Sequence, residues 1–521
     1  MSTFKNPIIP GFYPDPSICR VGDDYYLVTS TFEFFPGVPI FHSKDLVNWK
    51  QLGHVLDRPS QLDLTDTPPS CGIWAPTIRY HEGTFYMITT FVVSREGARR
   101  NFYVTAKNPE GPWSDPVWLE DAPGIDPSLF FDDDGRVYYT GNRLSPTGKK
   151  HLKQNEIWLQ ELDINQGKLV GERLGIWDGA LKNAHAQEAP HLYKKDGYYY
   201  LIIAEGGTGY THAVTVARSE SITGPYESSK RNPILTHRHL GKNSEIANVG
   251  HADIIETQNG DWWLVCLASR PYGGHYRNLG RETFLAPMIW EDDWPVMCPD
   301  TGKIDLEMER PDLPEHLWPS LPAYDSFESE QLDLRWNFLR TPDESIYSLS
   351  ERPGYLRLNL RPENTIEYKN PSFIGRRQQH LSFSASTVLE FTPASKEEAA
   401  GVLLIQNHNY QFRLEVGIDQ NAPVVRLVRR ENGEETVVAS NPYSQSIVYL
   451  KVEAHGQSYH FYYGEKSDEW VELKIEEDGR ILSTDLAGGF TGAYLGPFAT
   501  SNGAQSQNHA DFDWFYYSGL D

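Results

Sequence analysis

The first three hundred residues contain one pattern five times, and this repeat constrains the fold more than any other feature. In each copy a residue precedes Pro (Ala in the fifth copy), and apolar positions, a turn with Asp or Gly and an aromatic-rich strand follow. The copies align at Asp15-Pro16, Ala75-Pro76, Asp126-Pro127, Ala189-Pro190 and His251-Ala252. Successive copies are 60, 51, 63 and 62 residues apart. A near-constant period predicts a repeat architecture of five equivalent units.

Each copy is predicted to form a β-hairpin. Turn residues such as Asp-Gly or Asn-Gly separate two runs of high β propensity, and a second hairpin follows before the next copy begins. Two hairpins make a four-stranded sheet, and five such sheets predict a five-bladed β-propeller over residues 1–309. No long amphipathic helical pattern interrupts this region, so we expect an all-β fold.

A second domain is predicted beyond the propeller. Residues 310–324 are rich in proline and are expected to form a semi-rigid linker. From residue 325 to 521 apolar and polar residues alternate between glycine-bearing turns, as in 355–360 and 411–416. Such alternation is typical of antiparallel sheets with one buried face, which predicts a β-sandwich.

The repeat also predicts where functional side chains meet. In a propeller the first strand of every blade lines the central channel, so residues at equal register approach one another. Three acids, a histidine and an indole occupy the aligned position or its neighbour: Asp15, Asp126, Glu188, His251 and Trp74. We therefore expect these side chains to converge on one pit.

The three acids are the candidate catalytic groups. Taken alone, an Asp before Pro is most often a turn residue, and Glu188 is explained as well by a surface loop. Three carboxylates in one channel would repel one another and lose hydration, a cost that favours a functional role. Two carboxyls flanking a glycosidic bond suit hydrolysis, one protonating the leaving oxygen and the other activating water. Carboxyl separations cannot be read from a sequence, so retention and inversion both stay open.

Charge and composition exclude several classes of partner. A net charge of −24 argues against nucleic acid and anionic membrane surfaces and fits a neutral substrate.

The four cysteines show no CxxC pairing, which predicts neither a zinc site nor a disulfide framework. Neither a secretion signal nor an apolar run of membrane-spanning length is found, so we expect a cytoplasmic protein. The basic cluster Lys149-Lys150-His151 is predicted to be a solvated loop. Aromatic residues reach 13%, which fits strands and also sugar stacking.

Five motifs together resemble glycoside hydrolase family 43, and within it the two-domain β-xylosidases. They are Asn6 to Ser17 (NPIIPGFYPDPS), GIWAP at 72–76, GIDPS at 124–128, EAPHLY at 188–193 and LGRET at 279–283. The resemblance covers essentially the whole chain. It implies a five-bladed propeller followed by a concanavalin-like sandwich, with a loop of the sandwich closing the far wall of the active site.

The resemblance assigns a role to each acid. It implies inversion of anomeric configuration, with Asp15 as general base and Glu188 as general acid. Asp126 would modulate the pKa of Glu188 and orient it. One departure is Ala189, where the family motif has Gly.

The resemblance also implies substrate-binding residues. Phe32 and Trp74 would form hydrophobic walls of the terminal sugar pocket. Arg281 would donate hydrogen bonds to sugar hydroxyls, although an interior arginine that merely pairs with an acid is the alternative. His251 would lie on the propeller axis and contact substrate, and in some relatives it supports a calcium ion through water. Phe490 is the candidate for the aromatic inserted from the sandwich, with a core Phe in a strand as the alternative.

These expectations define one activity and its alternatives. The chain is predicted to be an exo-acting, inverting β-1,4-xylosidase that releases xylose from the non-reducing end of short xylo-oligosaccharides. It would need no cofactor, although a structural or activating Ca²⁺ near the propeller axis fits some relatives. The alternatives are an α-L-arabinofuranosidase or bifunctional enzyme, and a non-catalytic carbohydrate-binding propeller. The resemblance suggests a homo-oligomer, a dimer or a tetramer.

Overall fold

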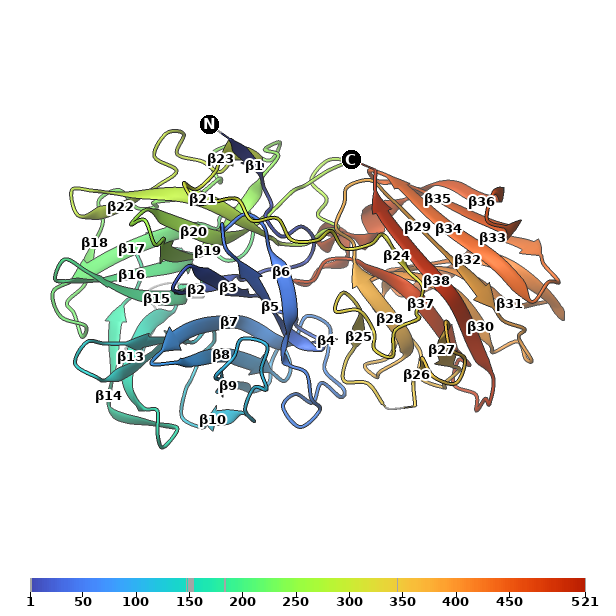
Figure 1. Ribbon diagram of the computed structural model, residues 1–521, viewed down its shortest axis with the longest axis horizontal. Coiled ribbons are helices and arrows are strands. Elements are labelled where there is room, and N and C mark those ends of the chain that lie inside the picture. Colours follow the sequence, from blue (N-terminus) through green and yellow to red (C-terminus); the bar gives the residue numbers. More distant parts are fainter. Residues whose placement is uncertain (1, 147, 149–153, 182–183, 344, 521) are drawn as a thin grey trace.

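The chain is almost entirely β-structure (Figure 1). The computed structural model describes residues 2–146, 148, 154–181, 184–343 and 345–520, so the Lys149-Lys150-His151 cluster lies outside the described residues. Within these ranges the helical elements are the 3₁₀ turn η1 (Gly479–Leu482) and the short helix α1 (Thr484–Ala487). None of the helices in the described ranges is long and apolar enough to cross a membrane. The all-β prediction is confirmed.

Five four-stranded antiparallel sheets form the first domain, at the left in Figure 1. Blade 1 contains β2 (Ser17–Val21), β3 (Asp24–Val28), β5 (Gly37–Ser43) and β6 (Lys50–Leu56). Blade 2 contains β7 (Gly72–His81), β8 (Thr84–Val92), β9 (Arg99–Ala106) and β10 (Val117–Leu119). Blade 3 contains β11 (Ser128–Phe131), β12 (Val137–Arg143), β13 (Glu156–Asp163) and β14 (Lys168–Trp177). Blade 4 contains β15 (Glu188–Lys195), β16 (Tyr198–Glu205), β17 (Ala213–Ser219) and β18 (Glu227–Ser228). Blade 5 contains β19 (Ala247–Glu256), β20 (Trp262–Ser269), β21 (Glu282–Glu291) and β22 (Trp294–Met297). The predicted five-bladed propeller is confirmed.

The aligned residue of every repeat adopts the same unusual backbone conformation. Its φ is 56° at Asp15, 46° at Ala75, 55° at Asp126, 51° at Ala189 and 53° at His251. Positive φ is uncommon for residues other than glycine and recurs at functional sites. In β7, β15 and β19 the strand register shifts at this position, as in a β-bulge, which re-aims the neighbouring side chains. The innermost strands contact one another around the axis, so the five residues meet there.

A buried polar network fixes the innermost strands to one another. The carboxylate of Asp253 in β19 accepts hydrogen bonds from Ser17 Oγ at 2.7 Å and from Arg79 Nη1 at 2.8 Å. Arg79 Nη2 lies 2.9 Å from His191 Nδ1, and the Tyr193 hydroxyl donates to Asp253. Four blades are thereby joined through one ion pair, and the pair of β1 (Thr3–Lys5) with β23 (Glu307–Glu309) joins the two ends of the domain.

Two eight-stranded antiparallel sheets form the second domain, at the right in Figure 1. One sheet contains β26 (Tyr347–Ser348), β27 (Leu356–Asn359), β38 (His509–Gly519), β29 (Phe383–Glu390), β34 (Ile447–His455), β35 (Ser458–Lys466) and β36 (Glu469–Asp478), with β24 (Tyr324–Asp325) paired to β38. The other contains β33 (Glu434–Pro442), β32 (Ala422–Glu431), β31 (Tyr410–Asp419), β30 (Ala399–Asn407), β37 (Tyr494–Thr500), β28 (Ser372–Arg377), β25 (Asn337–Leu339) and β4 (Phe34–Phe35). The predicted β-sandwich is confirmed.

The last strand of the second sheet comes from the propeller. The β4 strand pairs with β25, so the segment directly after Phe32 is part of the sandwich. Phe12, Phe32 and Phe34 pack in one buried cluster with Phe373, Leu403, Ile405 and Tyr494 of the sandwich. The sequence pattern does not predict this strand exchange, which fixes the sandwich against the mouth of the propeller.

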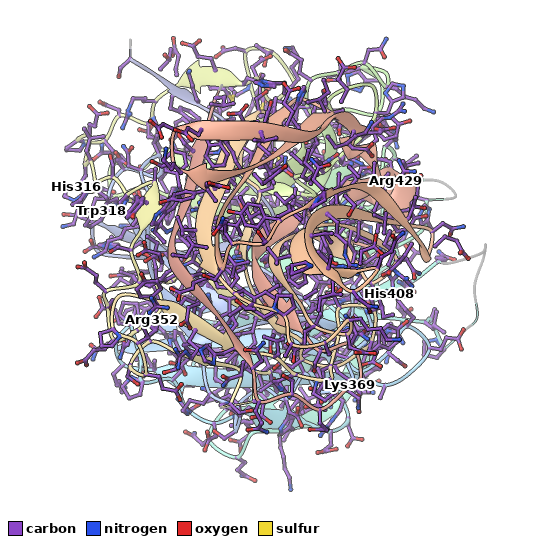
Figure 2. All side chains as sticks on the ribbon, turned by 90° about the vertical axis from the view of Figure 1, so that its right-hand side faces the viewer. His316, Trp318, Arg352, Lys369, His408 and Arg429 are labelled. Carbon is purple, nitrogen blue, oxygen red and sulfur yellow. The ribbon has the colours of Figure 1, made fainter. Side chains whose placement is uncertain are left out.

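The segment between β23 and β24 lies along blade 1. Trp318 Nε1 donates to Asn48 O at 3.2 Å, and Arg310 Nη2 pairs with Asp45 at 2.9 Å. Figure 2 shows His316 and Trp318 on one side of the sandwich and His408 on the opposite side. The connection between the domains is therefore anchored to blade 1 at the start and in the middle of its proline-rich run.

Candidate active site

A cavity of about 650 Å³ lies where the inner strands of the propeller meet the sandwich. All eight residues predicted for the site line it: Asp15, Phe32, Trp74, Asp126, Glu188, His251, Arg281 and Phe490. Seven come from the propeller and one, Phe490, from the sandwich. The repeat and the resemblance therefore lead to one place in the structure.

Asp15 is buried and is held as a carboxylate. Its Oδ1 lies 2.6 Å from Arg281 Nη1, and its Oδ2 accepts a hydrogen bond from Ser30 Oγ at 2.6 Å. Burial alone would raise the pKa of Asp15, but Arg281, His251 and the Ser30 hydroxyl together bring it below its ordinary value. Asp15 is therefore ionised at neutral pH and can accept a proton.

The pKa values of Glu188 and Asp126 are raised, whereas that of Asp15 is lowered. Burial and the charge of Asp15 raise the pKa of Glu188 to about 7. Burial, Glu188 and Asp15 raise the pKa of Asp126 well above its ordinary value. The two acids titrate as a coupled pair that retains a proton near neutral pH. Glu188 is the more exposed of the two, and none of the described residues hydrogen-bonds its carboxyl, so its proton can reach a bound ligand.

His251 lies beside the ion pair. Its Nδ1 is 3.8 Å from Asp15 Oδ1, and burial, together with the charge of Arg281, lowers its pKa, so the ring is neutral. Within the described ranges no group of three or more His, Cys, Asp or Glu side chains is placed to hold a metal ion. Both oxygens of Asp15 are already engaged, so the side chains around His251 do not form a set of direct calcium ligands.

Three aromatic rings form one side of the cavity. The ring centroids of Phe32 and Trp74 are 5.8 Å apart, and Phe490 meets Trp74 edge-on at 5.4 Å. Phe490 lies between α1 and β37 rather than in a strand, so the strand alternative is wrong. The Arg281 guanidinium faces the rings of Phe32 and Phe490 at 5.5 and 5.8 Å. Flat apolar rings beside hydrogen-bonding groups suit the two kinds of surface that a sugar presents.

Ser70 anchors these rings across the domain boundary. Its Oγ accepts a hydrogen bond from the backbone N–H of Phe490 at 2.9 Å, and its carbonyl accepts one from Trp74 Nε1 at 3.2 Å. The N–H of Ser70 in turn donates to Glu33 Oε2 at 2.9 Å. Burial raises the pKa of Glu33 to about 7. The position of Phe490 therefore depends on a buried acid of blade 1.

Several residues of the cavity were not predicted. Ser30 bridges Asp15 and the backbone N–H of Ala75, and Thr208 Oγ1 lies 3.3 Å from Arg281 Nη1. Asn155 and His185 also line the cavity. Thr208 carries a usable signal, because it stands in the glycine-rich run 206–209 after strand β16. Ser30 carries none, since it lies two residues beyond the end of the second strand of blade 1 and has no equivalent in the repeat.

The arrangement places one ionised acid and a protonated acid pair around a cavity with aromatic and guanidinium walls. This combination defines an enzyme that cleaves glycosidic bonds by acid–base catalysis, a glycoside hydrolase. Residues 4–295 match the family described as "Glycosyl hydrolases family 43", and residues 324–518 match the "Beta xylosidase C-terminal Concanavalin A-like domain". The chain belongs to glycoside hydrolase family 43.

Individual relatives match over the full length. A "Xylosidase/arabinosidase" of Butyrivibrio fibrisolvens is 48% identical over 516 residues, which cover 98% of each chain. A non-reducing end alpha-L-arabinofuranosidase of Bacteroides ovatus is 42% identical, over 100% of this chain and 95% of the relative. The crystal structure of a xylan beta-1,4-xylosidase from Bacillus halodurans C-125 has a TM-score of 0.94 at 40% identity, covering 99% of this chain and 100% of that one.

Proposed function

We propose that the chain is an exo-acting, inverting β-1,4-xylosidase that releases xylose from the non-reducing end of short xylo-oligosaccharides. One observation carries the proposal: Asp15 and Glu188 line the same cavity with pKa values displaced in opposite directions. Such a pair supplies a base and an acid at the same pH. The names of the full-length relatives support the substrate class.

Each acid has one task in this mechanism. Asp15 accepts a proton from a water molecule, whose oxygen attacks the anomeric carbon from the face opposite the leaving group. Glu188 gives its proton to the glycosidic oxygen as the bond to the anomeric carbon breaks. Asp126 keeps the proton on the acid pair and positions Glu188 through the peptide that follows it. Arg281 holds Asp15 ionised and presents donors to sugar hydroxyls.

The aromatic side of the cavity supports exo action. Phe490 is brought in from the sandwich and packs against Trp74 and Phe32. A chain that continued in this direction would collide with the sandwich, so the cavity would accept a terminal sugar. Its rings would contact the apolar face of that sugar and exclude water from one side of the scissile bond.

The mechanism is tested by NMR of the anomer released from xylobiose, with and without a chelator. Prompt appearance of α-xylose is expected, and β-xylose appearing first would contradict inversion. A calcium ion held near His251 through water remains a prediction, and loss of rate with chelator would support it. Glu188→Gln is expected to lower kcat/KM about 10²- to 10⁴-fold, because the proton donor is lost. Retention of activity would refute the assignment of the acid.

The second candidate is α-L-arabinofuranosidase activity in the same site. It is favoured by the relative from Bacteroides ovatus, whose name is that of an arabinofuranosidase. Comparing kcat/KM on the nitrophenyl glycosides of β-xylose and α-L-arabinofuranose distinguishes the two. A higher value on the arabinoside would reverse our order of preference.

A further inference from the structure

A second cavity, of about 260 Å³, lies on the sandwich and shares no lining residue with the active-site cavity. Its lining comes from the outward face of the sheet that contains β31, β32 and β33, and from the segments 364–371 and 499–502. Ligand cavities for drug-sized molecules begin at about 300 Å³, so this one suits a smaller ligand.

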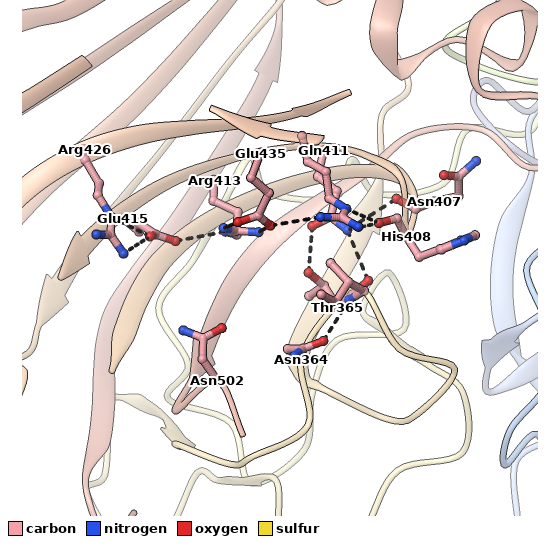
Figure 3. A network of polar contacts seen from close by, with 12 residues as sticks. Asn364, Thr365, Asn407, His408, Gln411, Arg413, Glu415, Arg426, Glu435 and Asn502 are labelled. Atoms are coloured by element: carbon pink, nitrogen blue, oxygen red, sulfur yellow. Dashed lines mark hydrogen bonds and ion pairs between the residues drawn. The ribbon is translucent and has the colours of Figure 1, made fainter. Parts of the chain in front are cut away.

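The ion pair of Arg413 with Glu435 lies in one wall of this cavity and is part of a row of ion pairs that continues beyond the lining (Figure 3). Arg413 Nη1 and Nη2 lie 2.8 and 3.1 Å from the two carboxylate oxygens of Glu435. Arg413 Nε lies 3.1 Å from Glu415, which also pairs with Arg426 at 2.7 Å. Arg413 is only 14% exposed, so the row is fixed before any ligand arrives. A guanidinium carries five N–H donors, and those that the acids leave unused are available to a ligand.

Neutral polar groups form the opposite wall. Figure 3 shows the amides of Asn364 and Asn502 across from the Arg413–Glu435 pair. Thr365, beside Asn364, is fixed by its hydrogen bond of 2.7 Å to Gln411 Oε1. Asn364 Oδ1 already accepts a hydrogen bond from the N–H of Ile366 at 3.1 Å, and Asn502 Nδ2 donates one to Glu397 O at 2.7 Å. Each amide keeps further donors and acceptors beyond these bonds. The two walls therefore offer donors and acceptors from opposite sides.

One exposed apolar side chain completes the lining. Ile366 is 36% exposed, whereas the lining residues Phe498 and Ala499 of β37 are each only 1% exposed. A large apolar side chain in a polar surface cavity provides contact area for a ligand with a nonpolar face.

The charged wall offers both donors and acceptors. Three guanidiniums share two carboxylates: Arg413 and Arg430 both face Glu435, and Arg413 and Arg426 both face Glu415. The Glu435 carboxylate therefore places hydrogen-bond acceptors beside the guanidinium donors. A ligand with several hydroxyls satisfies donors and acceptors alike, without adding charge.

We propose that this cavity is a second sugar-binding site, which holds one neutral sugar unit outside the catalytic pit. The turn between β30 and β31 links it to the active site. The carbonyl of His408 in this turn accepts hydrogen bonds from Gln411 and Arg430, and Asn407 Nδ2 donates to Ala487 O, three residues before Phe490. The choice of xylose as the sugar rests on the proposed function.

The test is a calorimetric titration of the full chain with xylotetraose, in a Glu188→Gln background that prevents hydrolysis. Two binding sites per chain are expected. The double variant Asn364→Ala/Asn502→Ala should bind at one site, while the matched control Asn421→Ala, in the exposed turn between β31 and β32, should keep two. Asn364→Trp is a second variant that fills the cavity, and thermal denaturation checks that all variants fold. With Glu188 intact, the double variant should hydrolyse xylobiose at an unchanged kcat/KM.

The possible outcomes separate the two proposals. One site in every variant would overturn the second sugar site and leave the catalytic proposal standing. One site that disappears in the double variant would support the sandwich site and count against sugar binding in the pit. No binding in any variant would overturn both.

Discussion

The backbone N–H of Ala189 donates a hydrogen bond of 3.1 Å to Oδ2 of Asp126. This contact joins the acid of blade 3 to the peptide that follows Glu188 in blade 4. Asp126 therefore acts on Glu188 in two ways. It fixes the backbone that carries the Glu188 side chain, and its carboxyl titrates together with that of Glu188 as a coupled pair. The two effects are separable by experiment.

Asp126→Asn should move the alkaline limb of the kcat/KM profile to lower pH. Glu188 must be protonated to act, and its pair with Asp126 retains a proton because two buried carboxylates repel each other. Removing one acid lowers the upper apparent pKa of the pair, so the proton is lost earlier as pH rises. We expect kcat/KM at pH 7 to fall about 10- to 100-fold. The exposed Asp134→Asn in the same blade is the control, and an unmoved limb in Asp126→Asn would refute the coupling.

Ser30→Ala should move the acidic limb to higher pH. The Ser30 hydroxyl donates to the Asp15 carboxylate at 2.6 Å and helps to lower its pKa. Without this donor the pKa of Asp15 rises, so the base is lost to protonation at a higher pH.

Ser17→Ala is the matched control for Ser30→Ala. The Ser17 hydroxyl also bridges blades 1 and 2, donating to Asp253 at 2.7 Å and accepting from the N–H of Ile78 at 3.1 Å. Ser17→Ala should lower the free energy of unfolding to a similar extent as Ser30→Ala, while the acidic limb of the kcat/KM profile stays in place. Equal shifts in both variants would mean that Ser30 is merely structural.

The sequence repeat predicts the aligned residues of the active-site cavity better than it predicts the contacts that support them. Asp15, Asp126 and His251 were placed by register alone, and their shared positive φ shows that the repeat encodes a local conformation as well as a spacing. The roles of Arg281 and Phe490 came from the resemblance. Neither source predicts Ser30 or the β4–β25 pair, because these contacts join segments far apart in sequence through side chains or backbone with no periodic signal.

Gly72→Ala should destabilise the chain by more than about 2 kcal/mol. Gly72 has a φ of 89°, and an added Cβ would lie 2.2 Å from the carbonyl oxygen of Phe32. Phe32 is bound there by two backbone hydrogen bonds with Ile73, of 3.0 and 3.1 Å, so it cannot retreat without opening the aromatic wall. Urea denaturation would measure the loss.

Gly83→Ala separates conformational strain from collision. Gly83 also has a positive φ, of 74°, but an added Cβ would meet no atom within 4 Å. We expect a cost of about 1 kcal/mol from the backbone alone and normal activity. If both variants lose the same stability, the contact with Phe32 is not the cause.

Glu33→Gln should flatten the dependence of stability on pH. Glu33 is buried, and its pKa is raised from 4.5 to about 7. In the native state it therefore retains a proton that the unfolded chain releases above about pH 4.5, so its contribution to stability is complete below that pH and is lost as pH rises to 7. Linkage over this range amounts to about 3 kcal/mol. Urea denaturation from pH 4.5 to 8 should show the free energy of unfolding of the variant rising relative to that of the parent chain, by about 3 kcal/mol in total.

Gln keeps an oxygen for the N–H of Ser70, so Phe490 should stay in place and kcat/KM should change little. The exposed Glu82→Gln is the control, and parallel stability curves for Glu33→Gln and the parent would show that Glu33 does not titrate in this range.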